Sequence, residues 1–328
     1  MSSPELDIQN LKISFATPKG KLTAVNGISF HLNQGETLAL VGESGCGKTV
    51  SALSILRLLP EPPAEIYSGK ILFSGQDLLS LNAKALQDLR GRSISMIFQD
   101  PMTSLNPVLT IGEQMAETLL RHTTMNRQEA LQNSADLLSR VELPSPKEKL
   151  KHYPHQLSGG MRQRVMIAMA LACSPRVLIA DEPTTALDVL IQAQILELLE
   201  NLKKEHGMSI LIITHDLGVV AKIAQRVLVM YAGEIVESGP ARALLDNPLH
   251  PYTKGLIASA PKLGALSKKG ARLEEIPGNV PRLDQRPSGC AFHPRCAWAI
   301  EKCKTQKPQL READTQRKWS CNLELGSL

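Results

Sequence analysis

The chain has 328 residues, of which 43% are hydrophobic and 21% are charged. This mixture excludes a disordered or fibrous protein, and the length suggests about two domains. The net charge of +5 suits an acidic partner or a membrane surface, and an aromatic content of 3% argues against a platform that stacks single-stranded nucleic acid. No apolar run approaches the roughly 18 residues of a membrane span, and the start lacks the features of a signal peptide. We therefore expect a cytosolic protein.

The first part of the chain predicts strands followed by a helix. Residues 5–15 and 27–32 alternate apolar and polar side chains, which predicts two antiparallel strands. The apolar run Thr37–Val41 predicts a strand buried on both faces of an α/β sheet. A helix is expected from Lys48 through Leu59, where a proline-rich stretch follows.

The rest of the chain predicts a helical insertion, a return to α/β alternation and an irregular end. Helical periodicity extends over about residues 100–156. Two apolar strands and a helix are expected between residues 176 and 214. We expect the first domain to cover residues 1–240 and a second, of residues 241–328, to be held by something other than a large core.

A glycine-rich motif lies between the buried strand and the first helix. Residues 42–49 match G-x-x-x-x-G-K-[ST], whose backbone amides and helix N-terminus surround phosphates. Lys48 would reach the β- and γ-phosphate oxygens, and the Thr49 hydroxyl would bind Mg²⁺. The flanking strand and helix argue against the alternative, a chance glycine-rich turn. The residues assigned to the nucleotide here are Gly42, Ser44, Gly45, Cys46, Gly47, Lys48, Thr49 and Val50.

Cys46 occupies a variable position of this motif, beside the N-terminus of the predicted helix. Such a position lowers the pKa of a thiol. We therefore expect Cys46 to react with alkylating agents and ATP to protect it.

Polar residues end two later strands. Asp181 would hold the metal through its water shell, and Glu182 is placed to orient and deprotonate an attacking water. His215 ends a second apolar strand, and parallel strands place their carboxyl ends along one crevice, so we expect its imidazole near the γ-phosphate. An ordinary solvated turn and a structural histidine are the alternatives.

The segment Leu157–Arg164 reads LSGGMRQR and resembles the LSGGQ signature of ABC-transporter ATPases, with Met161 replacing the usual Gln. The resemblance extends to an ordered set of motifs, namely the phosphate loop, Gln99 as the Q-loop, the signature, the Asp181–Glu182 pair, Ala186–Asp188 as the D-loop and His215 as the switch. It implies an α/β fold, an ABC-type P-loop ATPase with an antiparallel β subdomain, a helical subdomain and a small cysteine-rich C-terminal extension.

The resemblance also implies roles for individual residues. Ser158, Gly159, Gly160 and Asp188 would meet the γ-phosphate held by an opposing ATPase subunit, because one cassette supplies two half-sites. Gln99 would link Mg²⁺ and the attacking water to the loop that touches a membrane subunit, with a role-free Gln in a buried strand as the alternative. Phe15 is similar in placement to the aromatic residue that stacks on adenine, with a core Phe as the alternative.

These implications define the expected sites. The catalytic residues are Glu182, His215, Gln99 and Lys48, and the Mg²⁺ ligands are Thr49, Gln99 and Asp181.

Four of the six cysteines crowd the end of the chain, at Cys290, Cys296, Cys303 and Cys321. Four thiolates favour Zn²⁺ or an iron–sulfur cluster, although the spacing lacks paired C-x2-C knuckles, and free thiols are the alternative. With His250–Thr253, this tail resembles the C-terminal extension of the dipeptide and oligopeptide importer ATPases, which implies a [4Fe-4S] cluster in a structural role. We therefore expect the four cysteines to hold such a cluster.

The sequence as a whole predicts the ATP-hydrolysing subunit of a bacterial importer for dipeptides or oligopeptides. The resemblance implies a similar but nonidentical ATPase partner, two transmembrane permease subunits and an extracytoplasmic peptide-binding protein, with attachment to the cytoplasmic face of the inner membrane and no nucleic acid. The alternatives are an importer ATPase for nickel or another small solute, a soluble ABC ATPase acting on nucleic acid or ribosomes, and an iron–sulfur-sensing regulator.

Overall fold

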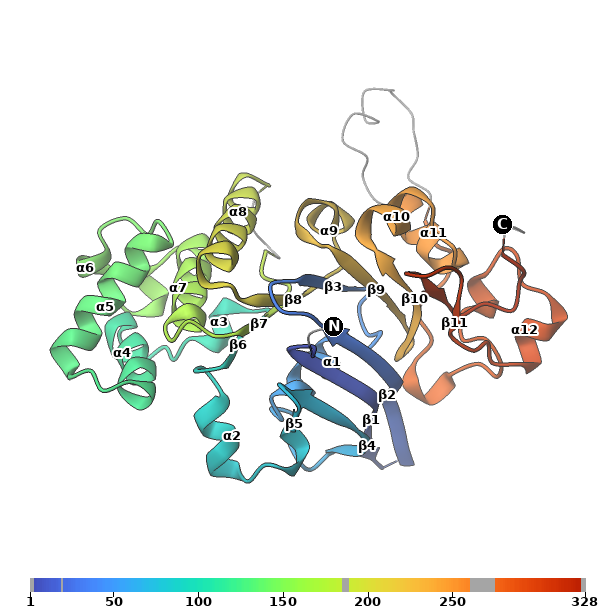
Figure 1. Ribbon diagram of the computed structural model, residues 1–328, viewed down its shortest axis with the longest axis horizontal. Coiled ribbons are helices and arrows are strands. Elements are labelled where there is room, and N and C mark those ends of the chain that lie inside the picture. Colours follow the sequence, from blue (N-terminus) through green and yellow to red (C-terminus); the bar gives the residue numbers. More distant parts are fainter. Residues whose placement is uncertain (1–2, 19, 185–188, 260–274, 326–328) are drawn as a thin grey trace. The chain divides into compact units, whose positions relative to one another are not determined.

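The computed structural model describes residues 3–18, 20–184, 189–259 and 275–325, which fold into two compact units (Figure 1). The first unit comprises Met1–Glu5, Leu32–Glu36 and Ser80–Ile212. The second comprises Leu6–His31, Thr37–Leu79 and Ile213–Leu328. Among the helices of the described residues, none has both the length and the apolar character needed to span a bilayer.

The first unit is mainly helical and also carries neighbouring strands of the eight-stranded sheet. Strand β6 (Ile94–Ile97) pairs in parallel with β7 (Val177–Asp181), and β8 (Ser209–Thr214), which begins in this unit, lies next to β7. The helices and 3-10 turns of this unit are α2 (Ala83–Leu89), α3 (Pro101–Ser104), α4 (Ile111–His122), α5 (Arg127–Arg140), α6 (Pro146–Lys149), η2 (Pro154–Gln156), α7 (Gly159–Leu171) and α8 (Val189–His206).

Local capping fixes the start of the two longest helices of the predicted insertion. Thr110 and Glu113 form a capping box at α4, and Asn126 and Glu129 form another at α5. The helices pack through Ala116, Leu119 and Ala130, and α5 also packs against α7 (Figure 1). The helical periodicity of residues 100–156 therefore corresponds to helices α3 to α6.

The second unit contains two sheets. In the four-stranded sheet the order is β2 (Gly20–Leu32), β1 (Leu6–Thr17), β4 (Ala64–Phe73) and β5 (Gln76–Asp77), with β4 antiparallel to both β1 and β5. In the other, β3 (Thr37–Val41) pairs in parallel with β9 (Arg226–Tyr231), and β9 runs antiparallel to β10 (Glu234–Pro240). All five residues of β3 are buried, as predicted for a strand covered on both faces.

The helices of the second unit are short. They are α1 (Lys48–Ile55), α9 (Leu217–Ile223), α10 (Ala241–Asp246), α11 (Pro251–Ser259) and α12 (Glu301–Thr305), with 3-10 turns η1 (Leu78–Ser80), η4 (Leu283–Gln285) and η5 (His293–Arg295). The helix predicted to reach Leu59 ends at Ile55, because Arg57 adopts a left-handed backbone conformation with φ 49°.

The C-terminal segment joins the second unit by strand pairing. β12 (Lys318–Trp319) runs antiparallel to β10, and β11 (Arg311–Glu312) pairs with β12. Trp319 is buried, and the Arg311 guanidinium lies 4.8 Å from the centre of its ring. The boundary predicted near residue 240 falls at the end of β10, whereas the two compact units divide the chain elsewhere, so that boundary stays a prediction.

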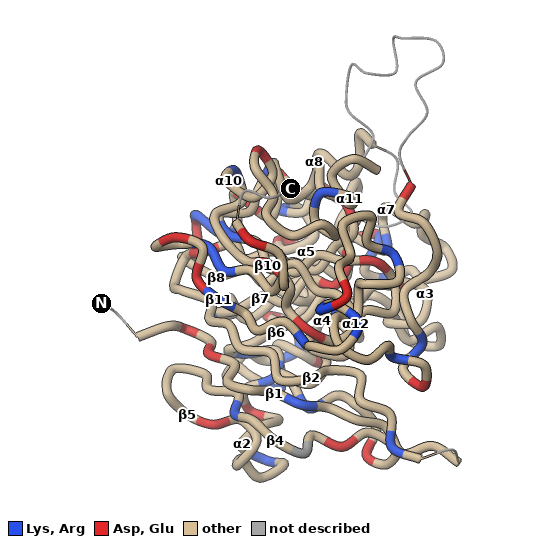
Figure 2. The backbone as a smooth tube through the Cα atoms, turned by 90° about the vertical axis from the view of Figure 1, so that its right-hand side faces the viewer, with Lys and Arg blue, Asp and Glu red and all other residues tan. Residues whose placement is uncertain are grey.

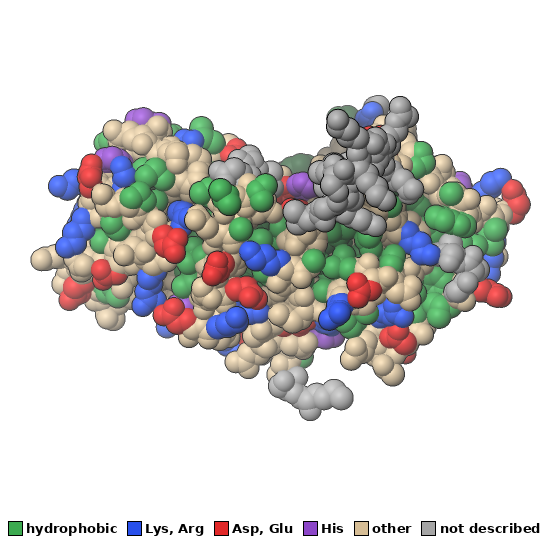
Figure 3. All heavy atoms as spheres, turned by 90° about the horizontal axis from the view of Figure 1, so that it is seen from above, with side chains coloured by type: hydrophobic (Ala, Val, Ile, Leu, Met, Phe, Trp, Pro, Cys, Tyr) green, Lys and Arg blue, Asp and Glu red, His purple; other side chains and the backbone are tan. Residues whose placement is uncertain are grey.

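Charges of both signs are distributed along the described residues. Acidic and basic residues are interspersed along the backbone tube of Figure 2, and on the face drawn in Figure 3 charged side chains lie among apolar ones. The net charge of +5 is therefore the small difference between 37 basic and 32 acidic residues that are mixed along the chain.

Candidate functional site

The glycine-rich motif forms the turn between β3 and α1 in the second unit. Lys48, the first residue of α1, is 5% exposed, and its ammonium donates hydrogen bonds to the carbonyl oxygens of Gly42 (2.7 Å) and Glu43 (3.0 Å). Both acceptors are neutral, so a phosphate would offer this buried cation a stronger, charged partner. The arrangement suits phosphate binding.

Two glycines of the loop are required by close contacts. A Cβ on Gly42 would lie 2.2 Å from the carbonyl oxygen of Met230. Gly47 has φ 107°, and a Cβ there would lie 2.8 Å from the Met230 Cε and 2.9 Å from the Ala24 oxygen. The loop therefore packs directly on β9 and on β2, which fixes its path.

The other assigned residues of the loop differ in exposure. Ser44 and Gly45 are exposed, whereas Thr49 and Val50 are half-buried. Gly45 has open space within 4 Å of an added Cβ. The exposed turn is the part of the loop that a phosphate would meet first.

Cys46 does not have the environment that the sequence predicted. Its side chain is fully buried, and burial raises the pKa of its thiol, which outweighs the nearby Lys48 ammonium that lowers it. The prediction of a lowered pKa was therefore wrong, and with it the expectation of a reactive thiol. The position contributes its backbone, whose carbonyl oxygen accepts a hydrogen bond from the Gly233 amide (2.8 Å).

In the first unit, the structure brings Gln99 and Glu182 together. Gln99 follows β6 and Glu182 follows β7, and the Gln99 Nε2 donates a hydrogen bond of 3.2 Å to Glu182 Oε2. Gln99 is exposed, which excludes the alternative of a glutamine within a buried strand. Glu182 has a left-handed backbone with φ 47°, a strained conformation that is often found at functional sites.

Asp181, the last residue of β7, is 1% exposed. The predicted Mg²⁺ ligands are therefore a buried carboxylate in the first unit, the Gln99 amide in the same unit and the Thr49 hydroxyl in the second. Oxygen donors of this kind are the ligands that Mg²⁺ prefers, so the donor set fits the ion.

The signature segment forms the exposed start of a long helix. Ser158 is the N-cap of α7, and its hydroxyl accepts a hydrogen bond from the Met161 amide (3.3 Å). Ser158 and Gly159 are exposed, and an added Cβ on Gly159 would meet nothing within 4 Å. This helix N-terminus can therefore receive an anion.

The remaining predicted residues are placed as follows. His215 is exposed directly after β8, and Phe15 is half-buried on β1, two residues before Thr17. Asp188, with the rest of the predicted D-loop, lies outside the described residues.

The four C-terminal cysteines do not form the metal centre that the sequence predicted. All four lie in described segments, and within these segments no group of three or more His, Cys, Asp or Glu side chains is arranged to hold a metal ion. Burial raises the pKa of Cys290 to about 11 and raises those of Cys296 and Cys321, so these thiols are neutral at pH 7 when no metal is bound. The predictions of a [4Fe-4S] cluster and of Zn²⁺ were wrong.

The extension is stabilised by packed aromatic side chains. Tyr231, Tyr252 and Phe292 form an aromatic cluster with ring centroids 4.6 to 5.4 Å apart, and His250 packs against it. Cys303 and Cys321 are buried in the extension as small apolar side chains. The expectation that so short a segment needs a metal clip is thus not met.

Sequence reasoning missed a contact between this extension and the phosphate loop. The Arg295 guanidinium holds the Glu43 carboxylate through two hydrogen bonds of 2.7 and 2.9 Å, and the Tyr252 hydroxyl accepts one of 2.8 Å from the Glu43 amide. Glu43 occupies a variable position of the motif, so its residue type carried no signal. Tyr252 lies in the segment that carried the family resemblance, which was its one sequence signal.

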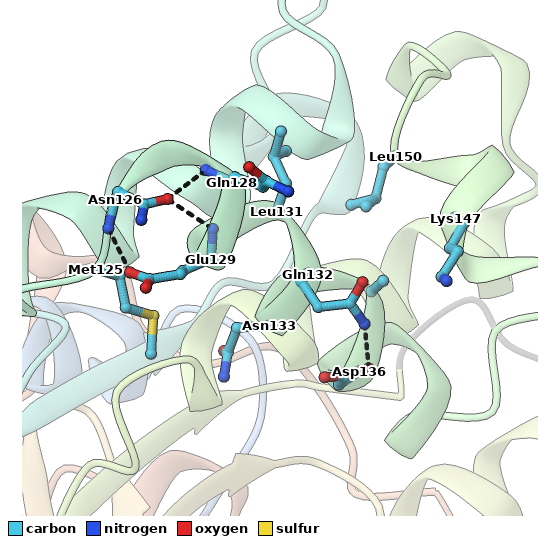
Figure 4. Close-up of a pocket in the computed structure, with 11 residues that line it drawn as sticks. Met125, Asn126, Gln128, Glu129, Leu131, Gln132, Asn133, Asp136, Lys147 and Leu150 are labelled. Carbon is cyan, nitrogen blue, oxygen red and sulfur yellow. Dashed lines mark hydrogen bonds between the residues drawn. The ribbon is translucent and has the colours of Figure 1, made fainter.

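A hollow on the helices of the first unit lies away from all these motifs (Figure 4). It measures about 870 Å³ and lies over α5 and α6. Figure 4 shows that several of its polar side chains already have partners on α5: the Asn126 and Glu129 side chains accept hydrogen bonds from backbone amides in the capping box, and the Gln132 amide donates one to Asp136 (3.1 Å). These groups stabilise α5, and none of the predicted site residues lines the hollow.

Comparison with known proteins identifies the family. Residues 25–185 match the ABC transporter family, and residues 236–303 match the oligopeptide/dipeptide transporter C-terminal region. The dipeptide transport ATP-binding protein DppD of Bacillus subtilis is 54% identical over 89% of this chain and 86% of its own. The oligopeptide transport ATP-binding protein AppD of the same organism is 50% identical over 97% of this chain and 96% of its own.

Solved structures agree with this match. The dimeric ATP-binding cassette MJ0796 bound to ADP and Pi superposes with a TM-score of 0.66 at 28% identity, covering 72% of this chain and 99% of that one. The fold is therefore that of an ABC ATPase cassette. The chain belongs to the ABC transporter ATPases, in the family of ATP-binding proteins that carry the oligopeptide/dipeptide transporter C-terminal region.

Proposed function

We propose that the chain is the ATP-hydrolysing subunit that drives import of dipeptides or oligopeptides across the bacterial inner membrane. The observation that carries the proposal is the hydrogen bond between Gln99 and Glu182, in a chain whose relatives are named for peptide transport. Residues 1–240 are assigned to the ATPase cassette and residues 241–328 to the extension, which the match over residues 236–303 supports.

The proposed reaction is transfer of the γ-phosphoryl group of ATP to water. Lys48 and the amides of the phosphate loop bind the β- and γ-phosphates. Glu182 accepts a proton from the attacking water, whose oxygen forms a bond to the γ-phosphorus while the bond to the β-phosphate oxygen breaks. His215 contacts the γ-phosphate, and the products are ADP and inorganic phosphate.

Mg²⁺ would be held by Thr49, Asp181 and Gln99, and when bound it neutralises charge on the phosphates. Gln99 has a second role, because its amide already donates a hydrogen bond of 3.2 Å to the Glu182 carboxylate. It orients the base that receives the proton, and so acts as a positioning residue.

A second ATPase subunit completes the proposed site. The helix N-terminus at the exposed Ser158 and Gly159 and the half-buried Gly160 would face the γ-phosphate held by the partner. Val189 and Leu190, at the start of α8, are 80% and 78% exposed, and apolar side chains this exposed are typical of an interface. We assign the partner to a homologous, nonidentical ATPase, which makes the pair a heterodimer.

Two transmembrane permease subunits and, through them, an extracytoplasmic peptide-binding protein are the further proposed partners. Three apolar residues near Gln99 in the chain have exposed side chains. Phe98 precedes Gln99 and is 39% exposed, and Met102 and Val108 follow it and are 61% and 75% exposed. Exposed apolar side chains near Gln99 in the chain suit a contact with a permease subunit. The chain would then be bound peripherally at the cytoplasmic face of the membrane.

The experiment measures the uptake of three solutes by cells that produce either the wild-type chain or its Glu182→Gln variant. Uptake of radiolabelled dipeptide and pentapeptide is expected to require Glu182, and uptake of radiolabelled nickel is not. Loss of nickel uptake with normal peptide uptake would move the assignment to the nickel importers. Normal uptake of all three solutes would remove the transport role.

A further inference from the structure

A pocket of about 640 Å³ lies beside the phosphate loop within the second unit. Its lining includes Thr17, Pro18 and Leu22, which come from β1, β2 and the turn between them, and Ser44 and Gly45 of the loop. The rest of the lining is Val280–Asp284 of the C-terminal extension, which we call the wall. Its volume suits a small organic ligand.

The Arg295 guanidinium connects the residues just before Val280 to the phosphate loop. Arg295 holds the Glu43 carboxylate, and its Nε donates to the Pro277 carbonyl oxygen (2.8 Å) while Nη2 donates to that of Ile276 (3.4 Å). The Arg295 side chain is 5% exposed. Glu43 precedes Ser44, and Pro277 lies three residues before Val280, so Arg295 fixes the loop and the far wall of the pocket to each other.

The residues just after Asp284 are also held in place. Arg286, two residues after Asp284, lies 3.2 Å from the Glu234 carboxylate. Glu234 begins β10, and the preceding Gly233 donates its amide hydrogen to the Cys46 carbonyl oxygen of the loop (2.8 Å). Both ends of the wall are therefore anchored close to the phosphate loop, although the segment itself has little regular structure.

The chemistry of the pocket suits the base and ribose of a nucleotide. Val280, Pro281 and Leu283 give the wall an apolar character, Leu22 adds a further apolar side chain to the lining, and Leu283 remains 36% exposed. Phe15 and Thr17 stand on the same face of β1, because side chains two residues apart in a strand point to the same side. A planar base attached to phosphates on the loop would bury these apolar surfaces.

We infer that residues 280–284 of the C-terminal extension form a wall of the nucleotide site and contact the base and ribose of ATP. The inference rests on the proposed function, which places the ATP phosphates on the loop of residues 42–49. It gives the extension a part in nucleotide binding, with Leu283 as the main contact and Arg295 as the residue that positions the wall.

The test measures binding of ATP, ADP and inorganic triphosphate, each with Mg²⁺, to the full-length chain. In Leu283→Asp, affinity for ATP and ADP is expected to fall by roughly ten-fold or more, because the base loses an apolar contact and meets a carboxylate. Affinity for inorganic triphosphate should stay within about two-fold, since that ligand lacks the base. The control is Leu325→Asp, at a leucine of the same extension that is 53% exposed and does not line the pocket.

The outcomes separate this inference from the proposed function. If the wild-type chain binds ATP and Leu283→Asp binds it equally well, the inference is overturned and the proposed function stands. An equal loss of ATP and triphosphate binding would also overturn it, because the effect would then lie on the phosphate loop. If the wild-type chain binds neither ATP nor triphosphate, the proposed function fails and the inference fails with it.

Discussion

The amide of Gln99 and the carboxylate of Glu182 are joined by a hydrogen bond of 3.2 Å, although the two residues are separated by 83 positions in the chain. Each follows the end of a strand, β6 and β7, and these strands pair in parallel. The pairing sets the two side chains next to each other, so a substitution at Gln99 should change the orientation of the Glu182 carboxylate.

Gln99→Ala should lower kcat for ATP hydrolysis by about ten-fold or more, because the base loses the group that orients it. ATP binding should be nearly unchanged, since Lys48 and the loop remain. Steady-state kinetics and nucleotide titration measure the two effects separately. The control is Gln128→Ala, at an exposed residue of α5. An unchanged kcat would show that Gln99 does not position Glu182.

Gly47→Ala should destabilise the fold by about 2 kcal/mol or more and abolish ATP binding, since an L-residue is strained at this φ. The added Cβ would also meet Met230 and Ala24 at less than 3.0 Å. Gly75→Ala is the matched control, because Gly75 has φ 84° and open space around an added Cβ. If thermal unfolding and ATP titration show equal effects for the two variants, the close contacts at Gly47 contribute nothing to stability or to ATP binding.

Arg295→Met should cost roughly 3 kcal/mol of stability, because it leaves the partly buried Glu43 carboxylate without its cation. It should also weaken ATP binding, since Glu43 belongs to the phosphate loop. Arg295→Lys should lie between wild type and Arg295→Met, as it keeps the charge and loses the two-pronged geometry. Denaturant unfolding checks this, with Arg242→Met as a control at a side chain that is 95% exposed. Wild-type stability in Arg295→Met would contradict the expectation.

His250 should make the fold less stable as the pH falls below its ordinary pKa. Burial lowers the pKa of His250 to about 3, and its Nδ1 accepts a hydrogen bond from the Tyr252 amide (3.0 Å). Between about pH 6.5 and 3 the unfolded chain therefore binds a proton that the folded chain does not. The free energy of unfolding should fall by up to about 1.4 kcal/mol for each pH unit in this window.

Glu237 acts in the opposite direction, so a variant is needed to isolate His250. Burial raises the pKa of the Glu237 carboxyl, and the stability it contributes is therefore lost as the pH rises. His250→Asn keeps an acceptor for the Tyr252 amide and cannot titrate, so the dependence of the unfolding midpoint on pH should become flatter between pH 6.5 and 5. His155→Asn, at an exposed histidine, should leave it unchanged. An equal slope in wild type and His250→Asn would refute the assignment.

The sequence predicted those features whose signal is local. The phosphate loop, the buried strand Thr37–Val41 and the strand Ser209–Thr214 each occupy one continuous run with its own pattern, and the structure has them where they were expected. The same holds for the helical insertion, whose starts are marked by capping boxes at Thr110 and Asn126.

Features that depend on distant residues were not predictable. Glu43 meets Tyr252 and Arg295 across 209 and 252 positions, and nothing in a variable position of a motif indicates such partners. The prediction of a metal centre at the four C-terminal cysteines failed for a related reason, because closeness in the sequence does not determine how four thiols are oriented. At Cys46 the helix N-terminus was visible in the sequence, whereas the burial that raises the thiol pKa was not.

Turnover by Glu182→Gln tests the ATPase mechanism most directly. The variant should bind ATP with wild-type affinity, because the amide has the same shape as the carboxylate, and its kcat should fall at least about 100-fold, because the amide cannot accept the proton of the attacking water. Glu205→Gln, at an exposed glutamate that pairs with Arg140, should hydrolyse ATP at the wild-type rate. If Glu182→Gln also hydrolyses ATP at the wild-type rate, Glu182 is not the base and the proposed mechanism is wrong.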